Sequence, residues 1–176
     1  MNLYLLRHAS AGQRRSNAIL DQKRPLDKEG QQQCILLGRT LNTLKVNFDC
    51  VVSSPLKRAL QTAVLVGTEA GYDKKILVTP ALAPEGVWAD FQKLLESLTA
   101  YEEVLLVGHN PNLPQYLTRL VCPDATHPLF RLRKGAVAAL EVQRGVARLN
   151  WVVDPRLVRA AQSSVTKSSR AKTSPK

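Results

Sequence analysis

The amino-acid sequence predicts a three-layer α/β/α sandwich with a mostly parallel central sheet. Short apolar runs typical of strands alternate along the chain with segments of helical periodicity. This alternation is typical of βαβ units, in which helices cover both faces of a parallel sheet. The length of 176 residues and the hydrophobic content of 44% suit one domain with a single core.

The strands and helices of this fold can be placed by their patterns. Strands are expected at Leu3–Leu6, Cys50–Ser53, Lys75–Thr79, Val104–Val107, Ala136–Val142 and Ala147–Val153. Helices are expected at about Lys28–Leu44, Pro55–Ala70, Ala89–Leu98 and Leu113–Val121. Since only three residues, Gln143-Arg144-Gly145, separate the last two strands, that pair should form a hairpin at the edge of the sheet.

The C-terminal end has a different composition from the rest. A short helix is expected after Asp154-Pro155 and should run to about Gln162. Residues 162–176 contain basic residues, no acid and almost no hydrophobic residue, so they predict a disordered tail. The folded domain is therefore expected to span residues 1–161.

The formal net charge of +11 constrains the partners of the protein. Such an excess suits an anionic substrate, an acidic partner protein or loose nucleic-acid binding, and an inert basic surface is an equally good interpretation. Aromatic residues make up only 5% of the chain, too few for a platform on which bases stack. Specific recognition of nucleic acid is therefore not expected.

Membrane and disulfide-rich classes are not expected either. No apolar run reaches the roughly 18 residues of a membrane span, and Met1-Asn2-Leu3 does not begin a signal peptide, so a cytoplasmic protein is expected. Cys34, Cys50 and Cys122 are scattered and form no CxxC motif. We expect them to be small core residues and not disulfide partners or zinc ligands.

Polar motifs follow three of the predicted strands. Arg7-His8 ends the first strand, "SPLKR" at 54–58 follows the second, and "GHNPN" at 108–112 follows the strand at 104–107. Ligands of open α/β sheets bind at the carboxyl ends of the strands. This arrangement would gather His8, Arg58 and His109 around one point.

Each motif also has a local structural interpretation. Ser54 is expected to cap a helix with Pro55 in its first position, so that Arg58 lies in the first turn, where the helix end favours an anion. Gly108 would let backbone approach closely, and Asn112 is expected to cap the next helix. Any one motif could be an ordinary helix start or turn, but their joint occurrence predicts an anion site.

The motifs resemble those of the histidine phosphatase superfamily, which has the phosphoglycerate-mutase-like fold. The resemblance is carried by "LRHA" at 6–9, "SSPLKRALQTA" at 53–63 and "VGHNP" at 107–111. The segments "RPLDKEG" at 24–30 and "CPD" at 122–124 are most similar to the SixA-type phosphohistidine phosphatase branch. The resemblance covers roughly residues 1–153.

The resemblance implies roles for individual residues. His8 would be the nucleophile that becomes phosphorylated, Arg7, Arg58 and His109 would bind the phosphoryl oxygens, and Arg24 would add a further contact. Arginine forks match phosphate geometry, and phosphoryl transfer depends mainly on positioning and charge stabilisation. His8 must be unprotonated at the attacking nitrogen, and its other nitrogen is expected to donate to a backbone carbonyl.

The sequence departs from the wider family where a proton donor is expected. In "PALAPEGVWAD" at 80–90, Glu85 is the candidate general acid and Asp90 a weaker one. The alternative interpretation is that Glu85 is a solvated loop residue without a role in catalysis. Imidazole leaves phosphorus more readily than an alkoxide, so a phosphohistidine substrate would need less acid catalysis.

The resulting prediction is a metal-independent phosphatase without a cofactor. Its expected substrate is phosphohistidine on a protein, such as a phosphotransfer domain. A small-molecule phosphomonoester phosphatase and a non-catalytic phosphate-binding module are the alternatives. The third histidine, His127, is expected to be exposed. Arg131, Arg133 and Lys134 either line the rim and meet an acidic substrate or form a solvated face.

Overall fold

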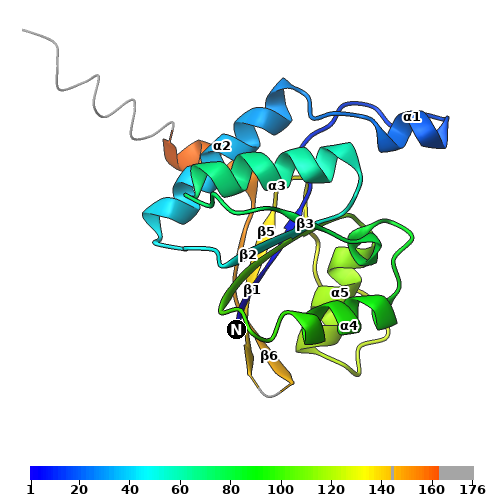
Figure 1. The fold of residues 1–176 in the computed structure, drawn as a ribbon, viewed down its shortest axis with the longest axis vertical. Helices are drawn as coiled ribbons and strands as arrows, with labels where there is room; N and C mark the ends of the chain where they lie inside the picture. Colours follow the sequence, from blue (N-terminus) through cyan, green and yellow to red (C-terminus); the bar gives the residue numbers. More distant parts are fainter. Residues whose placement is uncertain (144, 163–176) are drawn as a thin grey trace, which may run out of the picture.

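The computed structural model describes residues 1–143 and 145–162 (Figure 1). Within them, six strands form one sheet in the order β3-β2-β4-β1-β5-β6. The strands are β1 (Asn2–Arg7), β2 (Cys50–Ser53), β3 (Leu77–Val78), β4 (Glu103–Gly108), β5 (Val137–Gln143) and β6 (Val146–Val153).

The sheet is mixed, with a parallel part and an antiparallel edge. β4 lies between β1 and β2 and runs parallel to both, and β3 continues the parallel part beside β2. β5 is antiparallel to β1 and to β6, so the last two strands form the edge hairpin that the sequence predicts. The three adjacent parallel strands end at the same edge, where a site is expected.

Helices cover both faces of this sheet. α2 (Lys28–Thr43) and α3 (Lys57–Glu69) pack on one face, and η1 (Pro80–Leu82), α4 (Trp88–Ser97) and α5 (Asn112–Val121) pack on the other (Figure 1). Alternate side chains of β1 serve the two faces. Tyr4 and Leu6 enter the core under α2 and α3, whereas Leu3 and Leu5 enter the opposite core. The predicted three-layer sandwich is therefore confirmed.

Several elements differ from their predicted form. The strand expected at Lys75–Thr79 is reduced to β3, because Leu77 and Val78 are exposed and little burial extends it. The helix α1 (Ala18–Gln22) and the short η1 were not predicted. α1 buries none of its residues, so it lacks the apolar periodicity by which helices are recognised.

The C-terminal part and the cysteines complete the comparison with the sequence. A helix over 155–162 follows Asp154 as predicted, so Gln162 belongs to this helix and not to the expected disordered tail. The rest of that tail, residues 163–176, lies outside the described residues. Cys34 and Cys50 are buried, but Cys122 is partly exposed, so its expected core position was wrong. In the described part of the chain, no helix has the length and apolarity needed to cross a membrane.

Candidate active site

The carboxyl ends of β1, β2 and β4 bring the predicted site residues together. Arg7 ends β1 and is paired in register with Gly108 at the end of β4, so His8 and His109 leave adjacent strands side by side. The centroids of the two imidazole rings are 4.9 Å apart, and the ring planes are inclined by 51°. Two histidines separated by a hundred residues in sequence therefore share one site.

His8 is fixed by two backbone contacts. Its N–H donates to Gly108 O at 3.0 Å, and its Nδ1 lies 2.8 Å from Ala9 O. A carbonyl oxygen can only accept, so Nδ1 carries the proton and Nε2 keeps its lone pair, as the sequence predicts. Burial lowers the pKa of His8 to about 3, helped by the charges of Arg58 and Arg7. The ring is therefore neutral at neutral pH.

His109 is more deeply buried and has a different partner. Its Nε2 lies 2.9 Å from Ser54 Oγ, which also accepts the N–H of Leu56 at 3.3 Å. The other ring nitrogen, Nδ1, is buried and has no hydrogen-bond partner among the described residues. Burial lowers the pKa of His109 to about 2, assisted by the nearby His8 and arginines. If Ser54 donates to Nε2, Nδ1 carries a proton that a ligand can accept.

The expected capping role of Ser54 was wrong. α3 begins at Lys57, two residues later than predicted, and its N-cap Leu56 makes no side-chain cap hydrogen bond. Pro55 therefore lies outside the helix. The Ser54 hydroxyl instead bonds to a histidine on the neighbouring strand end, a contact that sequence spacing cannot show.

The expected capping role of Asn112 was also wrong. Asn112 is the first residue of α5, and its Nδ2 donates to the backbone carbonyls of Ala83, Pro84 and Gly86 at 2.9–3.1 Å. The amide thus holds the loop before α4 against the site. Gly108 does permit the predicted close approach, since a Cβ there would lie 3.1 Å from Leu82 O.

Two arginines, the half-buried Arg7 and the buried Arg58, lie beside the histidines. Arg58 lies in the first turn of α3, and its Nη1 donates to Asp21 O at 2.9 Å. Arg7 Nη1 donates to Leu132 O at 2.9 Å. The Nε atoms of both arginines are buried without a hydrogen-bond partner in the described part of the protein. Buried, unpaired donors are costly, and phosphoryl oxygens would satisfy them.

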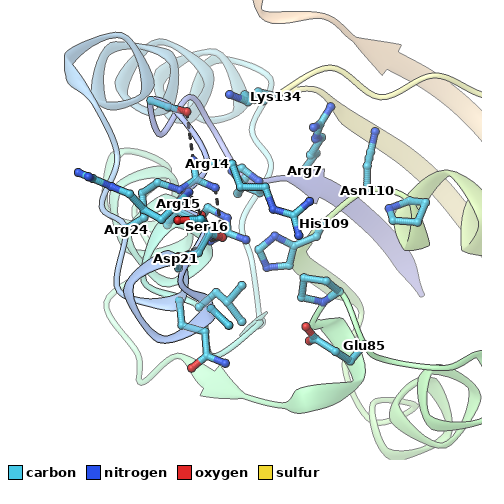
Figure 2. A pocket seen from close by; sticks show the side chains of 18 residues that line it. Arg7, Arg14, Arg15, Ser16, Asp21, Arg24, Glu85, His109, Asn110 and Lys134 are labelled. Atoms are coloured by element: carbon cyan, nitrogen blue, oxygen red, sulfur yellow. Dashed lines mark hydrogen bonds and ion pairs between the residues drawn. The ribbon is translucent and has the colours of Figure 1, made fainter.

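These groups open into a cavity of about 810 Å³. Figure 2 shows its charged side chains around the central space, with Glu85 on the side opposite Lys134. Its lining is predominantly cationic, and the two carboxylates are those of Asp21 and Glu85. The cations are Arg7, Arg14, Arg15, Arg24, Arg58 and Lys134. A pocket with this balance attracts an anion such as phosphate.

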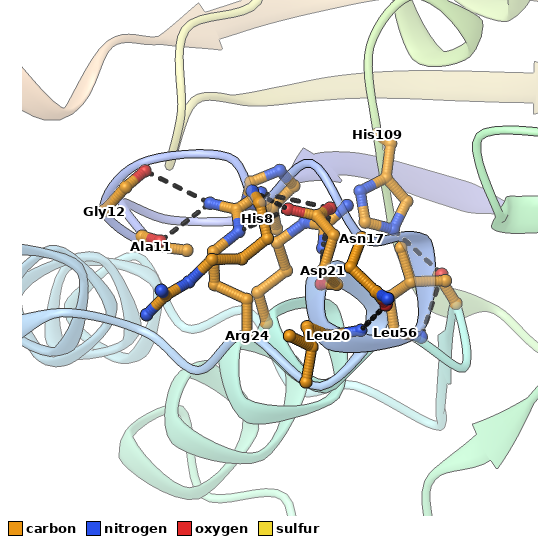
Figure 3. Close-up of polar contacts among 12 residues, drawn as sticks. His8, Ala11, Gly12, Asn17, Leu20, Asp21, Arg24, Leu56 and His109 are labelled. Atoms are coloured by element: carbon orange, nitrogen blue, oxygen red, sulfur yellow. Dashed lines mark hydrogen bonds and ion pairs between the residues drawn. The ribbon is translucent and has the colours of Figure 1, made fainter.

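Asp21 is a site residue that the sequence analysis missed. Its carboxylate accepts from Arg24 Nε at 2.9 Å and lies 3.3 Å from Arg58 Nη1 (Figure 3). Although burial acts in the opposite direction, the Arg15 N–H and these arginines lower the pKa of Asp21 to about 2. An acid three residues before Arg24 was visible in the sequence, but the unpredicted α1 carries it.

Arg24 lines the cavity, but most of its guanidinium donors form hydrogen bonds with other residues of the protein. Besides Asp21, it donates from Nη1 to Ala11 O at 2.7 Å and to Gly12 O at 3.1 Å (Figure 3). Arg24 therefore braces the turn that follows His8. A direct contact of Arg24 with substrate stays a prediction.

Asp27 supports the same turn from the other side. Its Oδ2 accepts from Ser10 Oγ and from Gly12 N, each at 2.7 Å, while its Oδ1 caps α2 by accepting from Gly30 N. Gly30 is required there, because a Cβ would lie only 2.0 Å from Ser10 O. The small residues after His8 are thus held in a fixed shape beside the cavity.

The remaining candidates occupy different positions. Glu85 lines the cavity, whereas Asp90 lies in the first turn of α4 and is not part of the lining. His127 is exposed, as predicted. Among the described residues, no group of three or more His, Cys, Asp or Glu side chains could hold a metal ion.

Comparison with known proteins identifies similar chains. The family model of the histidine phosphatase superfamily (branch 1) matches residues 3–88. The chain is 32% identical to an uncharacterized protein of Picosynechococcus over 89% of this chain and 93% of that protein. It is 30% identical to the phosphohistidine phosphatase SixA of Escherichia coli, over 93% of this chain and 99% of the relative.

A solved structure supports the same relationship. The protein histidine phosphatase SixA complexed with tungstate superposes with a TM-score of 0.80 at 28% identity, covering 90% of this chain and 99% of that one. The similarity therefore extends over most of this chain and nearly all of the related one.

Proposed function

The chain belongs to the histidine phosphatase superfamily and is a phosphatase, and from this premise we propose that it removes phosphate from phosphohistidine on a protein. In this proposal His8 is the nucleophile. Arg7, Arg58 and His109 bind the phosphoryl oxygens.

The observation that carries the proposal is the state of His8. Its ring is neutral, its proton is held at Nδ1 by Ala9 O at 2.8 Å, and the cavity beside it is cationic. A neutral imidazole nitrogen is a competent nucleophile toward phosphorus, and fixed cations stabilise the charge on the equatorial oxygens. A site that only binds phosphate would not need such a nucleophile.

In the first step, the Nε2 lone pair of His8 attacks the phosphorus. A new N–P bond forms while the bond from phosphorus to the substrate nitrogen breaks, and that electron pair returns to the leaving imidazole. The positive charge that develops on the His8 ring is stabilised by Ala9 O, which accepts the Nδ1 proton in a hydrogen bond. Arg7 and Arg58 line the cavity, and their guanidinium groups offer donors to the transferred group.

In the second step, water attacks the phosphoryl group on His8. A P–O bond forms, the N–P bond breaks, and the electron pair returns to Nε2. A proton of the water passes to a phosphoryl oxygen, and inorganic phosphate leaves as H₂PO₄⁻. His8 is then neutral again with its proton still on Nδ1, so the cycle closes without a change in its tautomer.

The leaving group favours phosphohistidine over a phosphate ester. A substrate imidazole already protonated on its other nitrogen departs as a neutral molecule and needs no general acid. An alcohol requires a proton, and Glu85 is the carboxyl group on the cavity wall that could supply it. Glu85 therefore supports a second candidate, hydrolysis of small phosphate monoesters.

The test is turnover of a panel containing a histidine-phosphorylated phosphotransfer domain, sugar phosphates and an aryl phosphate. We expect the phosphohistidine protein to have the highest kcat/KM and His8→Ala to abolish turnover of every substrate. His127→Ala is the matched control, because this histidine is exposed and outside the cavity, and it should behave as wild type. Faster turnover of a sugar phosphate would replace the proposal with the second candidate.

A further inference from the structure

A second, basic groove adjoins the phosphate cavity. It has a volume of about 530 Å³ and shares Arg7, Asn110 and Lys134 with the cavity wall. Figure 2 shows these three side chains along one side of the cavity. We call this second pocket the basic groove. Four cations line it besides Arg7: Arg131, Arg133, Lys134 and Arg156.

The loop that carries most of these cations is fixed to the catalytic strand end. Leu132 O accepts hydrogen bonds from Arg7 Nη1 at 2.9 Å and from Asn110 Nδ2 at 3.1 Å. Gly135 N donates to Arg7 O at 3.0 Å, and the Leu132 side chain is buried. The backbone of the loop is therefore held in position before any ligand binds, so that only the cationic side chains have to be ordered on binding.

The cations themselves are accessible and only partly neutralised. Asp154 is the carboxylate paired with Arg133, at 3.3 Å, and with Arg156, at 2.9 Å. The side chains of Arg133 and Arg156 keep 44% and 67% of their surface exposed. Arg131 is exposed and has no ion pair within the described residues. Glu29 also lines the groove and is paired with Arg159 at 3.1 Å. Two carboxylates, Asp154 and Glu29, do not balance the four cations, so the groove keeps a positive potential.

We propose that the basic groove docks acidic side chains that flank the phosphohistidine of the partner protein. This inference rests on the proposed function, because the groove is useful only if the phosphoryl group arrives on a larger chain. The cavity takes the phosphohistidine, and the neighbouring groove contacts the surface beside it. Opposite charges at the rim accelerate encounter and select between partners.

The experiment compares two chemically phosphorylated histidine peptides. One carries Asp and Glu beside the phosphohistidine, and the other carries Ser and Gln at the same positions. With the wild-type chain, we expect kcat/KM to be about tenfold higher for the acidic peptide at low salt. The preference should shrink as the ionic strength rises from about 0.05 to about 0.5 M.

Charge reversal locates this preference in the groove. R131E and R131E/R133E should remove the preference for the acidic peptide while leaving turnover of the neutral peptide and an aryl phosphate at wild-type rates. The matched control K74E/K93E makes two reversals at exposed lysines outside this groove and should keep the preference. R131E alone keeps the test valid if the double variant, with a new acid beside Asp154, folds poorly.

The failures of the two proposals can be told apart. If the wild-type chain hydrolyses an aryl phosphate but neither peptide, the proposed function is wrong. The docking inference is then overturned as well, because it depends on that function. If the wild-type chain hydrolyses both peptides equally, or if R131E keeps the preference, only the docking inference is overturned. Retention of single-stranded RNA by the groove without a peptide preference would assign the groove to nucleic acid and also overturn it.

Discussion

The two sides of the active-site cavity are built differently. The floor consists of Arg7, His8, Arg58 and His109, which lie at or near the carboxyl ends of buried strands. His8, Arg58 and His109 are buried, and Arg7 is half-buried. The opposite wall, residues 12–24, which we call the α1 arm, contains a helix of five residues that buries none of them. The floor is held by the sheet, whereas the arm is held by Asp21 and Arg24 (Figure 3).

The floor therefore performs the chemistry, and the arm adjusts it. Groups on the floor keep their geometry because strand pairing and core packing determine it. Groups on the arm depend on a few ion pairs, and an isolated helix of this length is not stable alone. Substitutions on the floor should therefore affect catalysis far more than substitutions on the arm.

After the loss of the nucleophile itself, the largest expected effect is the loss of a floor arginine. Arg58→Ala should lower kcat/KM by about 10³, because it removes a charged fork from the transferred phosphoryl group. Arg58→Lys should recover only part of this loss, since a lysine keeps the charge but not the fork. Arg14→Ala, the comparison variant on the arm, should stay within about threefold of wild type. Equal losses at the two positions would remove the distinction.

The next expected effect is a pH dependence of stability near pH 6, which comes mainly from the two floor histidines. Burial lowers the pKa of His8 to about 3 and that of His109 to about 2. Below pH about 6.5 these two rings therefore bind protons in the unfolded chain but stay neutral in the folded chain. The free energy of unfolding consequently falls as the pH falls. Each ring contributes a slope of up to about 1.4 kcal/mol per pH unit.

Denaturant titrations between pH 6.5 and 5 measure this slope. His109→Gln should reduce the slope by up to about 1.4 kcal/mol per pH unit, which is the contribution of one ring. Asp21→Asn should leave it unchanged, because the pKa of Asp21, about 2, lies below this range. An identical slope with and without His109 would mean that the folded chain protonates this ring normally.

Breaking the connection between the arm and the floor should have a smaller effect. Asp21→Ala removes the carboxylate shared by Arg24 and Arg58, so we expect kcat/KM to fall by about tenfold, with the larger part in KM. Trypsin should then cleave faster after Arg14 and Arg15, since the arm has lost its attachment. Wild-type kinetics and wild-type cleavage in this variant would show that the ion pairs do not hold the arm.

The smallest expected effect concerns Glu85. Glu85→Gln should slow aryl phosphate hydrolysis by about fivefold, well below the hundredfold or more of an essential general acid. Hydrolysis of phosphohistidine should change by less than about twofold, because the leaving imidazole needs no proton. A large and equal loss on both substrates would make Glu85 an essential acid.

The sequence predicts the floor well because each of its residues follows a recognisable strand. "LLRH" and "VGH" join a buried run directly to polar side chains, so strand order alone brings His8 and His109 together. The arm could not be predicted in the same way. Ile19 and Leu20 are exposed in α1, so its apolar residues show no burial pattern from which a helix could be inferred.

The sequence also could not predict which side chains form hydrogen bonds to residues of other helices, strands or loops. Ser54 and Asn112 have the residue types of helix caps, but their side chains bond to His109 and to the carbonyls before α4. The residue type shows that a side chain can cap a helix, but its actual hydrogen-bond partner depends on which groups the tertiary structure brings close to it. The same limit explains why Asp21 and Asp27 were not recognised as supports of the site.

The most direct test of the account is the identity of the covalent intermediate. After rapid quench of the wild-type chain with a ³²P-labelled phosphohistidine substrate, we predict an acid-labile, alkali-stable label on the peptide that contains His8. His8→Ala should carry no label and show no turnover. Turnover by wild type with no labelled enzyme, or with the label on His109, would contradict the assignment of His8 as the nucleophile.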